Sequence, residues 1–167
     1  MQSIDAIVRA AFPEDPLPEV FFRDHHAPDE DMPRELASRI QGRGWTRISL
    51  LDWRHVGATP GAYREYLAPA AFAYYTPSFL VGVVPQPEFM DLALEAILPS
   101  NRQRKPRGEW WSMYADSFTP PQRAALQAFL AYQREASHLL DVMDEELIRT
   151  AEAIWNAEPD RTSQTAG

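Results

Sequence analysis

The chain has 167 residues, a formal net charge of −8 and no cysteine. This length fits one domain, since domains usually span ~100–200 residues, and such a domain can bury a core without disulfides or metals. The missing cysteines exclude disulfides, thiolate metal sites and cysteine nucleophiles, and they fit a reducing cytoplasm. The negative charge argues against nonspecific binding to nucleic acid or anionic membranes. It suits a basic partner, although acidic surfaces also serve solubility alone.

The N-terminal segment shows no basic start followed by an apolar run, so no secretory signal is expected. Ser3 can cap a helix over residues 3–12, on which apolar residues recur with helical spacing. After a proline-rich connection, Asp31 is placed to cap a second helix that ends at Gly42. Residues 45–56 fit a helix or, around TRISLL, a short strand, and we favour the helix.

The most apolar stretch of the chain is PAAFAYYTPSFLVGVVP, residues 69–85, which carries no charge. A membrane span needs about 20 apolar residues, and the proline, glycine and tyrosines of this stretch favour a buried core element instead. Pro77 cannot donate a helical hydrogen bond, whereas Thr76-Pro77 is a good helix start, like Thr59-Pro60. We therefore predict a mainly α fold, a single compact multi-helix domain around a buried central helical hairpin or kinked helix (69–85).

The second half of the chain is also predicted to be helical. A helix begins near Pro87, a basic loop covers residues 99–109, and a short aromatic helix follows. Thr119 and Gln122 form a capping box that starts another helix, and residues 119–157 are either one helix or two. We predict a single α-helical domain over residues 1–158 and a flexible tail over residues 159–167.

The clearest cluster of chemically versatile side chains is Asp24-His25-His26 in a wholly polar turn. Histidine and carboxylate side chains ligate zinc, iron or manganese. The spacing matches no known metal signature, and adjacent histidines on an extended chain point to opposite faces. A solvated acidic turn is therefore favoured, and a small metal-dependent hydrolase using these residues is the alternative. His55, three residues after Asp52, could supply a base to such an enzyme.

Nucleotide-binding loops and the GxSxG nucleophile motif are absent. No catalytic residue and no cofactor is predicted. The basic loop followed by Trp110 and Trp111 has the composition of a stacking platform for nucleic acid. It is short and belongs to an acidic protein, so we expect the tryptophans to lie in the core and no nucleic acid to bind.

One segment of the sequence resembles a signature of a known family. AFAYYTPSFL, residues 71–80, resembles the AFxYYLPAFL signature of an uncharacterised bacterial family of small helical proteins, and GWTRISLLDW, FTPPQRAALQAFLAYQ and AEAIWN match further segments in the same order. The sequence departs from that pattern at Thr76, where the family usually has Leu, and at Ser78, where it often has Ala. The resemblance implies a fold and no activity.

These observations predict a non-enzymatic protein-binding protein in the cytoplasm, an immunity or antitoxin-like protein that neutralises a basic bacterial effector. Acidic surfaces would steer the basic partner. The residues expected to contact it are, in the polar turn, Asp29, Glu30 and Asp31, and on the last helix Asp141, Asp144 and Glu145. No membrane is expected among the partners.

Overall fold

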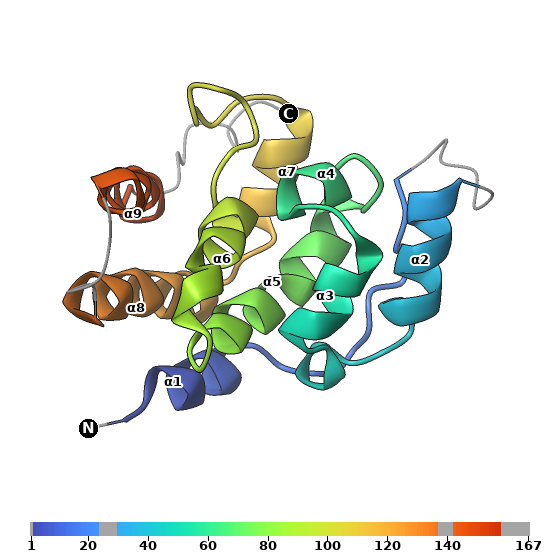
Figure 1. Ribbon diagram of the computed structural model, residues 1–167, viewed down its shortest axis with the longest axis horizontal. Coiled ribbons are helices and arrows are strands. Elements are labelled where there is room, and N and C mark those ends of the chain that lie inside the picture. Colours follow the sequence, from blue (N-terminus) through green and yellow to red (C-terminus); the bar gives the residue numbers. More distant parts are fainter. Residues whose placement is uncertain (1, 24–29, 137–141, 158–167) are drawn as a thin grey trace, which may run out of the picture.

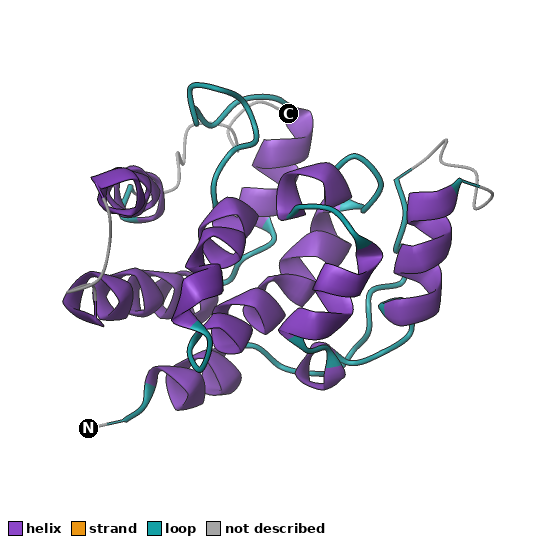
Figure 2. Ribbon diagram, viewed as in Figure 1, coloured by secondary structure: helices purple, strands orange, loops and turns teal. Residues whose placement is uncertain are grey.

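The computed structural model describes residues 2–23, 30–136 and 142–157, and these form helices joined by short connections (Figures 1 and 2). The α-helices are, in chain order, α1 (Ile4–Ala11), α2 (Asp31–Arg39), α3 (Leu50–Val56), α4 (Pro60–Tyr63), α5 (Pro69–Val83), α6 (Met90–Ile97), α7 (Glu109–Asp116), α8 (Pro120–Ala136) and α9 (Val142–Trp155). Two 3₁₀ helices, η1 (Trp45–Arg47) and η2 (Pro87–Phe89), complete them. The prediction of a mainly α fold is confirmed.

The centre of the fold is α5, as the apolar stretch predicts. Helices α1, α3, α6 and α7 all pack against it (Figure 1). Side chains on every side of α5 are buried, including Phe72, Tyr75 and Phe79. None of the described helices is both long and apolar enough to cross a bilayer. The stretch is therefore the core of the fold.

Of the two alternatives for residues 69–85, the helical hairpin is wrong, because α5 continues through Pro77 as one helix. Thr76 does not act as an N-cap. Its hydroxyl donates to the carbonyl oxygen of Phe72 at 2.9 Å and lies 3.1 Å from the hydroxyl of Tyr114. Packing on all sides holds the helix together across a residue that would break it in isolation.

Two predicted helix caps are confirmed. Ser3 accepts a hydrogen bond from the backbone N–H of Ala6 at the start of α1, at 3.3 Å. At the start of α8, Gln122 accepts from the N–H of Thr119 at 2.9 Å, and Thr119 accepts from the N–H of Gln122 at 3.4 Å. This is the reciprocal capping box.

The predicted cap of α2 is wrong. Glu30 is the N-cap residue, without a side-chain hydrogen bond, and Asp31 is the first helical residue. The Asp31 carboxylate pairs with Arg34 at 3.3 Å, an interaction between neighbouring turns.

The helix favoured over residues 45–56 is confirmed as η1 followed by α3, and the described residues contain no strand, only an isolated bridge between Phe22 and Leu67. Gly57 ends α3 with a φ of 88°, a left-handed conformation that favours glycine.

The C-terminal segment forms two helices. Helices α8 and α9 pack together, and Arg134 of α8 forms an ion pair with Glu152 of α9. The connection between them, residues 137–141, lies outside the described residues, as does the predicted tail.

Candidate functional site

The predicted partner-binding residues fall in two separate places. Glu30 and Asp31 lie at the start of α2, whereas Asp144 and Glu145 lie in the first turn of α9. These helices are at opposite ends of the molecule (Figure 1), so the two acidic patches do not form one surface. The remaining candidates lie outside the described residues: Asp24, His25, His26, Asp29 and Asp141.

The structure does not join Asp52 to His55. The Asp52 carboxylate accepts hydrogen bonds from the N–H and hydroxyl of Ser49, each at 2.8 Å, and from Arg43 at 3.3 Å. Burial acts to raise the pKa of Asp52, but the hydrogen bonds from Ser49 and Arg43 outweigh it and lower that pKa. His55 is exposed. Within the described parts of the chain, no three His, Asp or Glu side chains are grouped to hold a metal.

Asp144 lines a cavity of about 580 Å³ between the end of α5, the start of α6, α8 and α9, which we call the acidic groove. Val83 and Met90 are the buried part of its wall. Glu88 and Asp91 are exposed at its edge, and neither forms a salt bridge with any described residue. The residues that line it are Val83, Val84, Pro87, Glu88, Met90, Asp91, Tyr132, Gln133, Ala136 and Asp144.

Gln133 is the polar residue in the wall of the groove. It is only 4% exposed, and none of the hydrogen bonds among the described residues involves its side-chain amide. Buried polar groups are normally hydrogen-bonded. An amide without a protein partner in the wall of a groove is therefore available to a ligand. In the sequence, Gln133 lies at a position on the apolar stripe of its helix. A polar amide at such a position is the signal that could have indicated this site.

A second site forms around Arg64, just after α4. This arginine is 5% exposed, and its guanidinium donates to the carbonyl oxygens of Glu95, Ala96 and Leu98 at the end of α6. It also donates to the hydroxyl of Ser100 at 2.7 Å. Burial lowers the pKa of Arg64 to about 10, so the group is charged at neutral pH. No motif in the sequence singles out Arg64.

Aromatic rings enclose this guanidinium. Its central carbon lies 5.1 Å from the ring centre of Phe72, 5.6 Å from that of Trp110 and 5.8 Å from those of Trp111 and Tyr114. Ring faces attract cations, and the attraction is stronger away from water. The tryptophan pair therefore lies beside a buried arginine. Trp111 is in the core as predicted, whereas Trp110 is only partly buried against it.

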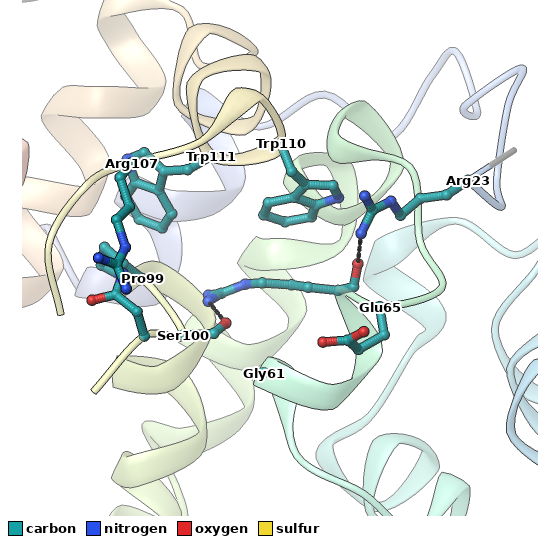
Figure 3. A pocket seen from close by; sticks show the side chains of 10 residues that line it. Arg23, Gly61, Glu65, Pro99, Ser100, Arg107, Trp110 and Trp111 are labelled. Atoms are coloured by element: carbon teal, nitrogen blue, oxygen red, sulfur yellow. Dashed lines mark hydrogen bonds between the residues drawn. The ribbon is translucent and has the colours of Figure 1, made fainter. Parts of the chain in front are cut away.

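Next to Arg64 is a cavity of about 230 Å³, which we call the arginine pocket. Figure 3 shows Arg107 on one side of it, Arg23 and Glu65 on the other, and Trp110 between them. Its lining residues are Arg23, Gly61, Arg64, Glu65, Pro99, Ser100, Asn101, Arg107, Trp110 and Trp111. Of the described residues, three guanidinium groups and one carboxylate thus surround the cavity, in a protein whose net charge is negative.

Comparison with known proteins identifies a family but no activity. No curated protein and no solved structure matches the chain. The family described as "Family of unknown function (DUF6714)" matches residues 1–158, nearly the whole chain and all of its described residues. The protein belongs to the DUF6714 family, a family of unknown function.

Proposed function

We propose that the protein is a non-enzymatic binding protein that holds a basic, amphipathic segment of a partner protein in the acidic groove. The observation that supports this most is the combination of an apolar wall, carboxylates at the edge and a nearly buried amide without a protein partner at Gln133. Each of these groups complements a different part of such a segment.

The apolar wall would supply most of the affinity. Val84, Pro87 and Tyr132 offer accessible apolar surface to a side chain of the partner, and burial of apolar surface is worth roughly 25 cal/mol per Å² before the costs of association. Exposed ion pairs contribute only about 0–1 kcal/mol each. Glu88 and Asp91 would therefore act mainly on the association rate and on the choice of a basic partner.

Gln133 would recognise the backbone of the partner. Its amide carries both a donor and an acceptor, which is what one peptide group needs. A partner segment that pairs with this amide would give it the hydrogen bonds that no described residue supplies.

The biological form that we propose is neutralisation of a basic bacterial effector, as an immunity or antitoxin-like protein does. The formal charge of −8 would attract such an effector at long range. The acidic residues at the start of α2, Glu30 and Asp31, remain a second predicted contact surface at the other end of the molecule.

The test is affinity capture from the native host at low salt, with protein identification and three baits. The baits are the wild type, the groove variant Glu88→Lys/Asp91→Lys, and the control variant Glu109→Lys/Asp116→Lys, which makes the same charge change at exposed sites on α7. We expect the wild type and the control to enrich the same basic protein and the groove variant to lose it. A further variant, Gln133→Leu, should weaken capture without altering charge.

Two results would contradict the proposal. One is that the groove variant captures the same protein as well as the control variant does. The other is that no protein with a basic segment is enriched by the wild type at low salt. Circular dichroism of each bait establishes that the fold is intact.

A further inference from the structure

The arginine pocket holds cationic groups that the protein itself leaves unpaired. Arg107 is exposed, and no salt bridge or side-chain hydrogen bond among the described residues involves it. Arg23 makes one hydrogen bond, from Nη1 to the carbonyl oxygen of Arg64 at 3.2 Å, and no described carboxylate pairs with it. Both guanidinium groups are therefore available to a ligand in the cavity.

The position of Arg23 is fixed through the backbone. The N–H of Arg23 donates to the carbonyl oxygen of Tyr66 at 2.7 Å, and the N–H of Ala68 donates to that of Phe21 at 2.9 Å. These bonds join the N-terminal segment to the connection between α4 and α5. They bring Arg23 beside Arg64, 41 residues further along the chain.

The charge of Arg64 increases the positive potential of the pocket. Its Nη1 and Nη2 donate to carbonyl oxygens, its Nε has no hydrogen-bond partner among the described residues, and no salt bridge joins it to a described carboxylate. The side-chain carboxylate of Glu95 acts on it through space, without an ion pair. A buried charge without an ion-pair partner favours an anion nearby, because electrostatic interactions are stronger in surroundings of low polarity.

Ser100 offers a hydrogen-bond donor to the same cavity. Its hydroxyl oxygen accepts from Nη1 of Arg64 at 2.7 Å, and no other described hydrogen bond uses this hydroxyl. Its proton is therefore free to point to a ligand. Asn101, which also lines the pocket, is engaged with the backbone of Lys105 and shapes the loop that carries Arg107.

Trp110 is held in the wall of the pocket by a hydrogen bond and a stacked ring. The indole N–H of Trp110 donates to the carbonyl oxygen of Leu67 at 3.0 Å, and its ring stacks on Tyr114 at a centroid distance of 5.3 Å. The volume of about 230 Å³ is below the ~300–1,000 Å³ of pockets for drug-sized ligands. Among the described lining residues, Glu65 is the one carboxylate, and it partly offsets the three arginines.

We infer that the arginine pocket binds a small oxyanion, held by Arg107 and Arg23 with the Ser100 hydroxyl as a further donor and Trp110 as one wall. Planar guanidinium groups match the oxygens of phosphate and carboxylate groups. The bound oxyanion is therefore the phosphate or carboxylate group of a small metabolite. This inference does not depend on the acidic groove, since the two sites share no lining residue.

The test is isothermal titration calorimetry of the full chain with inorganic phosphate and, in a second series, with succinate, at ionic strength held constant with chloride. We expect saturable binding of at least one of these anions. Arg107→Gln and Arg23→Gln should each weaken it by at least about tenfold, because each removes a charge-assisted hydrogen bond. The matched control is Arg102→Gln, an exposed arginine of the same loop that does not line the pocket, and it should bind within about twofold of the wild type.

The two titrants separate the possible sources: preference for phosphate indicates a phosphorylated ligand, and preference for succinate indicates a carboxylate. If neither anion shows saturable binding, the inference is overturned. So would equal affinities of the Arg107→Gln, Arg23→Gln and Arg102→Gln variants, which would mean that binding reflects nonspecific charge. The exposed positions of the three arginines make misfolding of these variants a small risk, and circular dichroism checks it.

Discussion

Arg64 connects three helices through one side chain. It follows α4, holds the carbonyl oxygens at the end of α6 and lies against the rings of α7. The last carbonyl groups of a helix have no partner within the helix, and here a buried guanidinium takes the place of a cap. The packing of α4, α6 and α7 therefore depends on this residue.

Arg64→Lys should destabilise the protein by about 3–5 kcal/mol, although it preserves the charge. A lysine has one nitrogen and cannot reach the carbonyl oxygens of Glu95, Ala96 and Leu98 together, so buried acceptors lose their donors. The measurement is the free energy of unfolding in urea. Arg107→Lys, at an exposed and unpaired site, should change it by less than about 0.5 kcal/mol. A cost below about 1 kcal/mol for Arg64→Lys would show that the arginine does not anchor these helices.

Ser78 is a second polar residue that the core requires. Its hydroxyl donates to the carbonyl oxygen of Tyr75 at 2.6 Å and accepts from the indole N–H of Trp53 at 2.8 Å. Ser78→Ala should therefore cost about 1–3 kcal/mol, because the buried indole N–H loses its acceptor. Urea unfolding of Ser78→Ala against Ser112→Ala, an exposed serine on α7, measures this. Equal stability of the two variants would contradict the expectation.

At the scale of elements, Thr-Pro steps have different meanings in this chain. Thr59-Pro60 and Thr119-Pro120 each start a helix, whereas Thr76-Pro77 lies inside α5. All three have the same local sequence signal. Only the burial of α5 on every side distinguishes the third, and burial depends on helices distant in the sequence.

The two Thr-Pro steps that start a helix also differ from each other, so their threonines form a matched pair of sites for substitution. Thr119 belongs to a complete capping box, whereas the side chain of Thr59 makes no cap hydrogen bond. Thr119→Ala should cost about 1 kcal/mol, and Thr59→Ala should cost less than about 0.5 kcal/mol. Urea unfolding of both variants checks this difference. A larger loss for Thr59→Ala would mean that the capping box of α8 contributes little.

At the scale of the whole molecule, buried tyrosines determine the response to alkali. Burial raises the pKa of Tyr63 and of Tyr114 to about 12, and it also raises the pKa of Tyr75. In the unfolded chain these groups titrate near pH ~10. Above that pH the folded state therefore keeps tyrosine protons that the unfolded chain loses. The contribution of these tyrosines to the free energy of unfolding is complete below about pH 10 and is lost as the pH rises toward 12.

Arg64 acts in the opposite direction, because its pKa is lower in the folded state than in the unfolded chain. Three tyrosines outweigh one arginine, so we expect the free energy of unfolding to fall between about pH 10 and 11. Urea unfolding at pH 9, 10 and 11 measures the fall, and Tyr75→Phe should make it shallower. Stability that is constant from pH 9 to 11 would contradict the assignment of these groups to the core.

The fold could largely be predicted from the sequence, because most elements have their start and stop signals within a few residues. Ser3, Gly57 and the box of Thr119 and Gln122 are examples, since a cap needs only its own turn. The departures have a common cause. Asp31 was expected to bond to the backbone, but it pairs with Arg34 across one turn, and Pro77 is accommodated by tertiary packing.

The candidate sites were less predictable, because they combine residues from distant segments. Asp144 was predicted as a contact residue, but its neighbours in the acidic groove come from α5, α6 and α8. The arginine pocket joins Arg23 to Arg107 through the backbone pairing of the N-terminal segment. Neither arrangement has a pattern in the local sequence, since each depends on how the helices pack around α5.

The distribution of the tryptophans gives the protein an internal optical probe. All five lie in described parts of the chain, and Trp45, Trp53, Trp111 and Trp155 are 7% exposed or less. Trp110 alone is half-buried, and it stands in the wall of the arginine pocket. We therefore expect blue-shifted fluorescence of which only a minor fraction is quenched by acrylamide, and Trp110→Phe should abolish that fraction. The indole that reports on the pocket is thus the one that solvent already reaches.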